Sequence, residues 1–95
     1  MNKNRIKLFK DALLAIEKLI QDYPDIQQFE SVKNQLNYLL EIEENKRTDI
    51  QRLKDIIIGI ITVREIEDRD MNVANLMYEV TEEVKKMKEE KNVKN

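Results

Sequence analysis

Four oxygen-bearing side chains have the spacing of ligands in a calcium-binding loop, with its first, third, fifth and twelfth positions occupied by Asp68, Asp70, Asn72 and Glu79. The sixth position of such a loop is Gly, because the chain turns sharply there, but this sequence has Val73. Val73 also begins a helical apolar stripe that continues with Met77 and Val80, which a calcium loop would interrupt. We therefore interpret this segment as an acidic corner between helices, and we predict neither a metal site nor a cofactor.

Catalytic chemistry has few possible carriers in this sequence. There is no Cys or His, and Ser31 is the single Ser, so a hydroxyl nucleophile would have no imidazole base beside it. The single Gly, Gly59, lies inside an apolar run and not in a phosphate-binding loop. The sequence thus favours a protein that acts by binding, and we predict that it is not an enzyme.

The composition is that of one small domain covering residues 1–95. Charged residues make up 38% of the chain, yet 17 basic and 19 acidic side chains leave a net charge of −2, which disfavours a strongly basic nucleic-acid binder. The basic N-terminal segment lacks the uninterrupted apolar run and the small-residue cleavage site of a signal peptide. The longest apolar run, residues 56–61, is far shorter than the roughly 20 residues of a membrane span. We expect a cytoplasmic protein with no membrane contact.

Apolar residues recur at steps of three and four along most of the chain, which predicts an all-α fold. The pattern indicates helical segments over residues 5–22, 25–44, 49–68 and 73–87. Pro24 ends the first helix, and the polar run 43–47 connects the second to the third. Neither Gly nor Pro separates the last two segments, so they are either two helices or one bent helix. We predict a small antiparallel bundle of three to four helices with a frayed tail over residues 88–95.

The third predicted helix is too apolar for the edge of a small bundle. Its Ile, Leu and Val residues cover more than half of the helical circumference, whereas an edge helix needs an apolar stripe of roughly 100°. This excess predicts a homodimer whose interface contains Ile56, Ile58, Gly59, Ile61 and Val63. Gly59 would allow close approach of a helix from the second chain, and the alternative is a tight crossing within one chain.

Charged residues are distributed unevenly along the chain. Basic residues, including Arg5, gather near both termini, while acidic residues gather around the two later connections. The acidic groups predict a surface that attracts a basic partner protein, and the alternative is ordinary solvated surface. The predicted contact residues are Glu41, Glu43, Glu44, Asp49, Glu65, Glu67, Asp68 and Asp70. For Tyr38 and Tyr78 we favour packing at the bundle edge over a role as partner anchors.

The apolar helix with one Gly followed by acidic residues, Leu53-Lys54-Asp55-Ile56-Ile57-Ile58-Gly59-Ile60-Ile61-Thr62-Val63-Arg64-Glu65-Ile66-Glu67, resembles a known family. Together with the preceding Leu36-Asn37-Tyr38-Leu39-Leu40, it is similar to small all-helical immunity proteins of type VI secretion toxin–immunity pairs. The likeness covers roughly residues 36–80. It implies a cytoplasmic dimer that binds and neutralises a co-encoded toxin without catalysis. The alternative function is a helical dimerisation or adaptor module of a small regulator, whose basic termini would contact nucleic acid; we consider nucleic acid the less expected partner.

Overall fold

Helices account for most of the computed structural model, which describes residues 3–94. The α-helices are α1 (Lys3–Asp22), α2 (Gln27–Glu43), α3 (Ile58–Ile61) and α4 (Met71–Glu90). A 3₁₀ helix, η1 (Ile50–Asp55), precedes α3, and a π-helical segment, η2 (Thr62–Ile66), follows α3 directly. The described residues contain no β-strand, so the predicted all-α class is confirmed.

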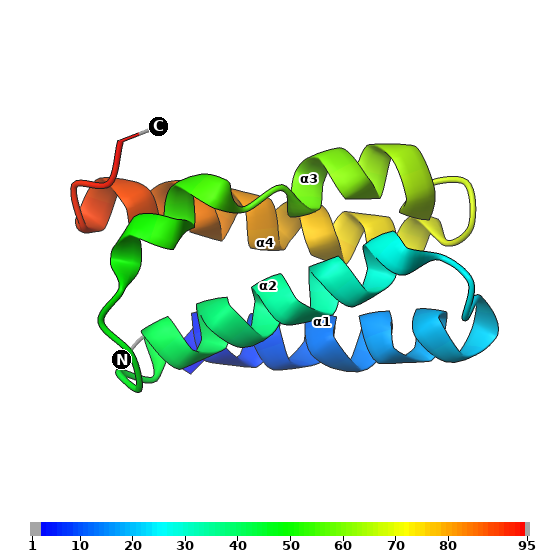
Figure 1. The fold of residues 1–95 in the computed structure, drawn as a ribbon, viewed down its shortest axis with the longest axis horizontal. Helices are drawn as coiled ribbons and strands as arrows, with labels where there is room; N and C mark the ends of the chain where they lie inside the picture. The colour runs from blue at the N-terminus through cyan, green and yellow to red at the C-terminus, as the bar shows by residue number, and fades with distance from the viewer. Residues whose placement is uncertain (1–2, 95) are drawn as a thin grey trace.

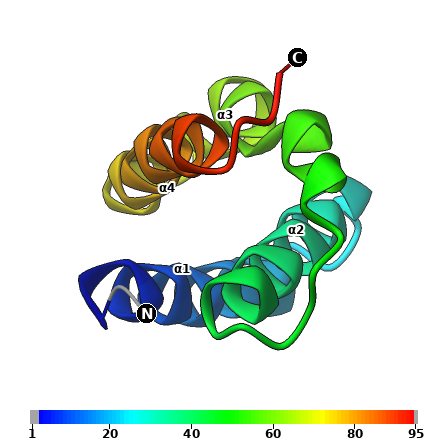
Figure 2. The ribbon, with the colours of Figure 1, turned by 90° about the vertical axis from the view of Figure 1, so that its left-hand side faces the viewer.

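The helices form two stacked layers of antiparallel segments (Figure 1). One layer contains α1 and α2, and the other contains α4 beside the series η1, α3 and η2. Figure 2 shows the two layers end on, with α1 below α4 and α2 below the segment that leads to α3. Phe9 and Ile16 of α1, Leu36 of α2 and Met77 of α4 are fully buried between the layers. The predicted antiparallel bundle is therefore confirmed.

The predicted continuous helix over residues 49–68 is wrong. The chain is extended at Ile56 and leaves helical geometry before α3 begins at Ile58. The backbone N–H of Ile57 donates to Gln35 Oε1 of α2 at 2.8 Å instead of to its own helix. This break changes which residues face inward, so that Leu53, Ile58 and Ile66 are all fully buried. A continuous helix would not place residues with those spacings on one face.

A turn over residues 67–69 separates η2 from α4, so the last two predicted segments are distinct. Asp70 begins α4 with its side chain, because Asp70 Oδ1 accepts a hydrogen bond from Val73 N at 3.1 Å. This is the usual role of Asp at a helix N-terminus. The predicted acidic corner between helices is thus observed, and Val73 lies in the first turn of α4 and not in a calcium loop.

The described part of the predicted tail is partly helical. Helix α4 continues to Glu90, and Asn92 then takes a left-handed conformation with a φ of 55°. The backbone N–H of Val93 donates to Lys88 O at 2.9 Å, which completes a Schellman motif. The Val93 side chain is 7% exposed, so the tail returns to the core. Asn95 lies outside the described residues.

Candidate partner-binding surface

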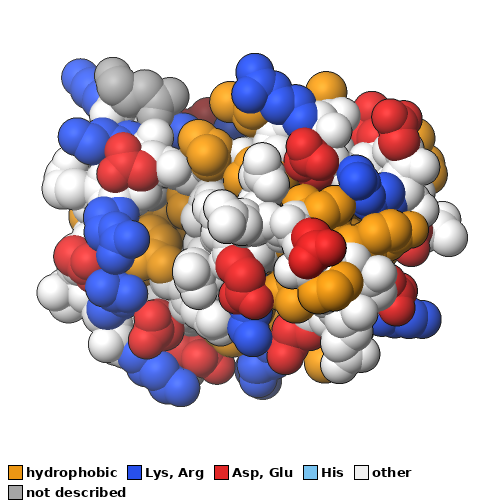
Figure 3. All heavy atoms as spheres, turned by 45° about the vertical axis from the view of Figure 1, so that its right-hand side comes forward, with side chains coloured by type: hydrophobic (Ala, Val, Ile, Leu, Met, Phe, Trp, Pro, Cys, Tyr) orange, Lys and Arg blue, Asp and Glu red, His pale blue; other side chains and the backbone are white. Residues whose placement is uncertain are grey.

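An apolar face is exposed to solvent after the break at Ile56 and Ile57, which changes the side chains that point outward. Ile57, Ile60 and Val63 are exposed by 47%, 54% and 58%, although the residues between them pack inward. Their spacing of three places them along one side of α3 and the start of η2. Figure 3 shows hydrophobic side chains gathered on part of the face that includes α3, with charged side chains of both signs around them. Exposed apolar residues that lie together in this way are typical of interaction surfaces.

The predicted dimer interface is divided by the fold. Ile58 is fully buried and Ile61 is 6% exposed, so both belong to the core of a single chain. A Cβ atom at Gly59 would lie 3.3 Å from Thr81 Oγ1 of α4, so Gly59 serves the crossing within the chain. Ile56 is partly buried, whereas Val63 is exposed. A second copy would therefore meet Ile57, Ile60 and Val63, and not the side chains of Ile58 and Ile61.

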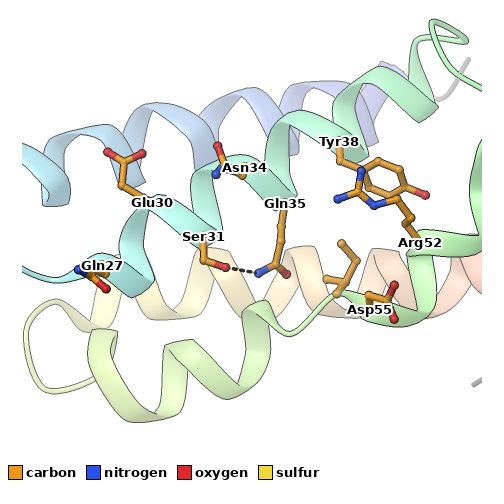
Figure 4. Close-up of a pocket in the computed structure, with 9 residues that line it drawn as sticks. Gln27, Glu30, Ser31, Asn34, Gln35, Tyr38, Arg52 and Asp55 are labelled. Carbon is orange, nitrogen blue, oxygen red and sulfur yellow. Dashed lines mark hydrogen bonds between the residues drawn. The ribbon is translucent and has the colours of Figure 1, made fainter.

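A polar groove of about 410 Å³ lies next to this apolar face, between α2 and η1. Most of the residues that line it have polar side chains, and the lining comprises Gln27, Glu30, Ser31, Asn34, Gln35, Tyr38, Arg52, Asp55 and Ile56. Figure 4 shows that α2 supplies one wall, while the segment that contains Arg52 and Asp55 supplies the other. Sequence reasoning did not predict this groove, because it forms only where the third predicted helix is broken.

Gln35 connects the two walls of the groove. Its Nε2 donates to Ser31 Oγ at 3.0 Å, the contact drawn in Figure 4, and its Oε1 accepts from the backbone of Ile57. Both ends of the amide are thereby used. The hydrogen bond to Ile57 thus fixes the distance between α2 and the start of α3 at this point of the groove.

Tyr38 lines the groove near Arg52, and two guanidinium groups stack on its ring. Its ring is buried, and its hydroxyl donates to Asp49 O at 2.7 Å. The Arg47 and Arg52 guanidinium carbons lie 5.0 and 5.2 Å from the ring centroid, which is cation–π distance. Burial, with the nearby Asp49 charge, raises the pKa of Tyr38. The phenol therefore remains a neutral hydrogen-bond donor, as expected for a packing role.

The first predicted acidic group, at the end of α2, is already paired within the chain. Arg47 binds Asp49 Oδ1 at 2.7 Å and Glu41 Oε1 at 3.1 Å, and its hydrogen bond lowers the pKa of Asp49. Glu44 lies 3.3 Å from Lys46 Nζ. Glu43 lies 3.4 Å from the Arg5 guanidinium, and its side chain is 9% exposed. These carboxylates serve the structure of the 44–50 connection.

The second predicted acidic group surrounds the turn between η2 and α4. Glu65 pairs with Arg69 at 3.4 Å, Asp70 caps α4, and Glu67 accepts a hydrogen bond from the Tyr78 hydroxyl. That hydrogen bond raises the pKa of Tyr78 to about 12. Asp68 is exposed and forms no ion pair with any residue in the range 3–94. Figure 1 places this turn at the opposite end of the molecule from the 44–50 connection, so the two groups do not form one acidic face.

Arg5 is a further charged residue that the sequence placed in a solvated basic segment. In the structure it is buried, with Nη1 and Nη2 each 2.9 Å from a Glu90 oxygen and Nε 3.0 Å from Glu83 Oε1. The hydrogen bond to Glu90 contributes most to raising the pKa of Arg5, and burial opposes it. The sequence held a signal for this role, because Arg5 precedes the buried Phe9 by one helical turn.

Within residues 3–94 no three acidic side chains are grouped so that they could hold a metal ion. None of the helices in the same range combines the length and hydropathy of a membrane-spanning helix.

Comparison with protein families identifies the chain. Residues 4–86, nearly the whole sequence, match the Tsi6 family. The chain belongs to the Tsi6 family, a family of type VI secretion immunity proteins. The predicted resemblance to such immunity proteins is therefore confirmed, and the match extends to the N-terminal helices that the resemblance did not cover. No curated protein and no solved structure gives a match to this chain.

Proposed function

We propose that this Tsi6-family protein neutralises a cognate toxin by stoichiometric binding that occludes the toxin, without catalysis. The family match over residues 4–86 carries the proposal. The groove between α2 and η1 supplies the physical means, because polar side chains around an apolar position, here Ile56, are typical of a protein interface. We place this activity in the cytoplasm, where an intracellular toxin would act.

Co-expression tests the proposal directly. The gene in the adjacent reading frame is expressed with and without this protein, and its product is purified with it. We expect the toxin to arrest growth alone, growth to recover with the immunity protein, and the two to elute as a stoichiometric complex. Growth arrest that persists despite equal expression of the two proteins, with no complex, would contradict the proposal.

We further propose that the protein is a homodimer, with Ile57, Ile60 and Val63 at the contact. The exposure of these side chains supports it, as does the small size of the chain, which limits the core that one copy can form. The three residues are symmetric about Ile60. A two-fold axis there would place Ile60 against its own copy and Ile57 against the partner's Val63.

Among the acidic residues predicted to bind the toxin, those near the turn between η2 and α4 remain candidates. Glu65 and Asp68 border the apolar face or lie close to it in the sequence, and Asp68 has no ion pair with residues 3–94. Glu65, like the remaining acidic residues, would have to leave a partner within the chain to bind a toxin. The nucleic-acid alternative is weakened in the same way, because Arg5 is buried and Lys85 and Lys86 pair with Glu82 and Glu83.

A further inference from the structure

Arg52 is a positively charged group that stacks on a buried ring and lies near the Asp49 charge without forming an ion pair with it. Arg47 and Arg52 both stack on the Tyr38 ring, but Arg47 is neutralised by Asp49 and Glu41. No carboxylate in the range 3–94 forms an ion pair with Arg52. Because Tyr38 is buried and bound to Asp49 O, the ring that orients Arg52 is itself fixed. The guanidinium is thus presented to the groove with most of its hydrogen-bond donors available.

The α2 wall of the groove offers free amides. Gln27 and Asn34 are exposed and line the groove, and neither side chain hydrogen-bonds to another residue in the described part of the chain. Each amide can donate and accept, which matches the N–H and C=O groups of an extended peptide. Gln35 differs, because its hydrogen bonds with Ser31 and Ile57 use both ends of its amide.

The remaining lining excludes some occupants. Glu30 and Asp55 also border the groove, so a multiply charged anion such as phosphate would be repelled more strongly than a single carboxylate that pairs with Arg52. Ile56 gives the lining an apolar position. A polypeptide that brings one carboxylate, backbone polar groups and an apolar side chain fits this combination. Arg and Tyr are also the residue types that most often dominate the energy of protein interfaces.

We propose that the α2–η1 groove receives an extended segment of the toxin, and that a carboxylate of this segment binds Arg52. This inference rests on the proposed function and specifies its binding surface. The Arg52 guanidinium can form two parallel hydrogen bonds to a carboxylate, a geometry that Lys cannot reproduce. The amides of Gln27 and Asn34 then bind the backbone of the same segment.

The first test is a charge reversal at Arg52. The affinity of Arg52→Glu for the toxin from the adjacent reading frame, used as a catalytically inactive variant, is measured by calorimetry. We expect the Kd to rise by about tenfold or more, because the new carboxylate repels the bound one. Lys18→Glu makes the same change of charge at an exposed position of α1 and is expected to keep the wild-type Kd. Circular dichroism melting of both variants verifies that they are folded.

The second test locates the contact without a change of charge. The natural sequence has no Cys, so Asn34→Cys introduces a unique thiol in the groove, and Lys18→Cys introduces one on α1. We expect the inactive toxin to slow maleimide labelling of Cys at position 34 and to leave labelling at position 18 unchanged. This measurement is made on the complex, so it does not depend on a loss of affinity.

The outcomes separate the two proposals. If the wild-type chain does not bind the toxin, both the proposed function and this inference are wrong. If it binds, but Arg52→Glu keeps the wild-type Kd and position 34 is labelled freely, the toxin docks elsewhere. A loss of affinity on Asp68→Lys in that case would assign the contact to the turn between η2 and α4.

Discussion

At the residue scale, Arg5 shows how a buried charge can replace apolar packing at the end of a helical bundle. Its guanidinium contacts Glu43 of α2 and Glu83 and Glu90 of α4, so one side chain joins three helices. Isolated surface ion pairs contribute little to stability, but a buried guanidinium with several hydrogen bonds is different. Removing it leaves carboxylates without their partner in a poorly solvated place.

We predict that Arg5→Met lowers the free energy of unfolding by about 3 kcal/mol, near the lower limit for a broken buried ion pair, because Glu90 remains half exposed to water. Lys7→Met is the matched control on the same helix. It removes an exposed pair with Asp11 and should cost no more than about 0.5 kcal/mol. Urea unfolding followed by circular dichroism measures both, and equal effects of the two variants would contradict the role of Arg5.

The same residue should make stability depend on pH. The hydrogen bond from Arg5 lowers the pKa of Glu90; at Glu83, burial acts in the opposite direction but is outweighed by hydrogen bonds from Arg5 and Lys86. Carboxylates whose pKa is lower in the folded state stabilise it above their unfolded pKa. This stability is lost as pH falls through the folded-state pKa.

We therefore predict that the free energy of unfolding of the wild type decreases from about pH 5 downward. The free energy of unfolding of Arg5→Met should decrease less over the same range. Asp49 also has a lowered pKa, but its partner Arg47 is present in both proteins, so the difference between them isolates Arg5. Urea unfolding at a series of pH values provides the measurement. Parallel pH profiles for the two proteins would show that Arg5 does not set the response.

At the element scale, the segment from η1 to η2 is where local pattern and final structure diverge. Apolar residues are so frequent in this segment that several different helix faces could be buried, and the sequence pattern does not show which one is. In the structure, Gln35 accepts a hydrogen bond from Ile57 N where the helix is broken. The π-helical segment η2 then changes again which residues face the core. The result buries Ile58 and Ile66 and exposes Ile57 and Ile60.

Gly59 tests the packing of this element against α4. A larger side chain there would press on Thr81, whose hydroxyl already donates to Met77 O at 3.0 Å. We predict that Gly59→Leu lowers the free energy of unfolding by about 2 kcal/mol through overpacking, despite its better helix propensity. Adding Thr81→Ala should restore part of the loss, measured as a non-zero coupling in a double-mutant cycle. Additive effects would show that Gly59 and Thr81 do not meet.

At the scale of the whole molecule, the apolar face and the α2–η1 groove lie on neighbouring surfaces. Ser31 borders both the groove and the apolar face, so partners at the two places would lie close together. The acidic groups, by contrast, are at opposite ends of the bundle and mostly paired. The proposed division assigns the apolar face to a second copy and the groove to the toxin.

We predict that Ile60→Lys converts the proposed dimer to a monomer without loss of fold. Ile60 is half exposed in one chain, so the change removes no core contact, but it places two like charges together at a two-fold axis. Sedimentation velocity measures the oligomeric state at micromolar concentration. Leu14→Lys on α1 is the control, because Leu14 is also an exposed apolar residue and lies away from α3. A wild-type monomer, or a dimer that survives Ile60→Lys, would contradict the proposal.

Much of the molecule followed from the sequence by itself, because helical periodicity and a single Pro act locally. The ranges of α1, α2 and the middle of α4, the antiparallel order and the membership in an immunity family were all accessible from residue types and spacing. Gly59 inside an apolar run predicts a close crossing, with a partner helix in the same chain or in a second chain.

Only the tertiary structure decided which isoleucines face water and which carboxylates are free. A residue such as Glu43 looks like solvated surface in the sequence, but Arg5 reaches it from a position 38 residues away. Likewise, the groove lies where Gln35 of α2 accepts a hydrogen bond from Ile57 N, 22 residues further along the chain. Contacts over such separations depend on how whole elements pack, and local propensity carries no information about them.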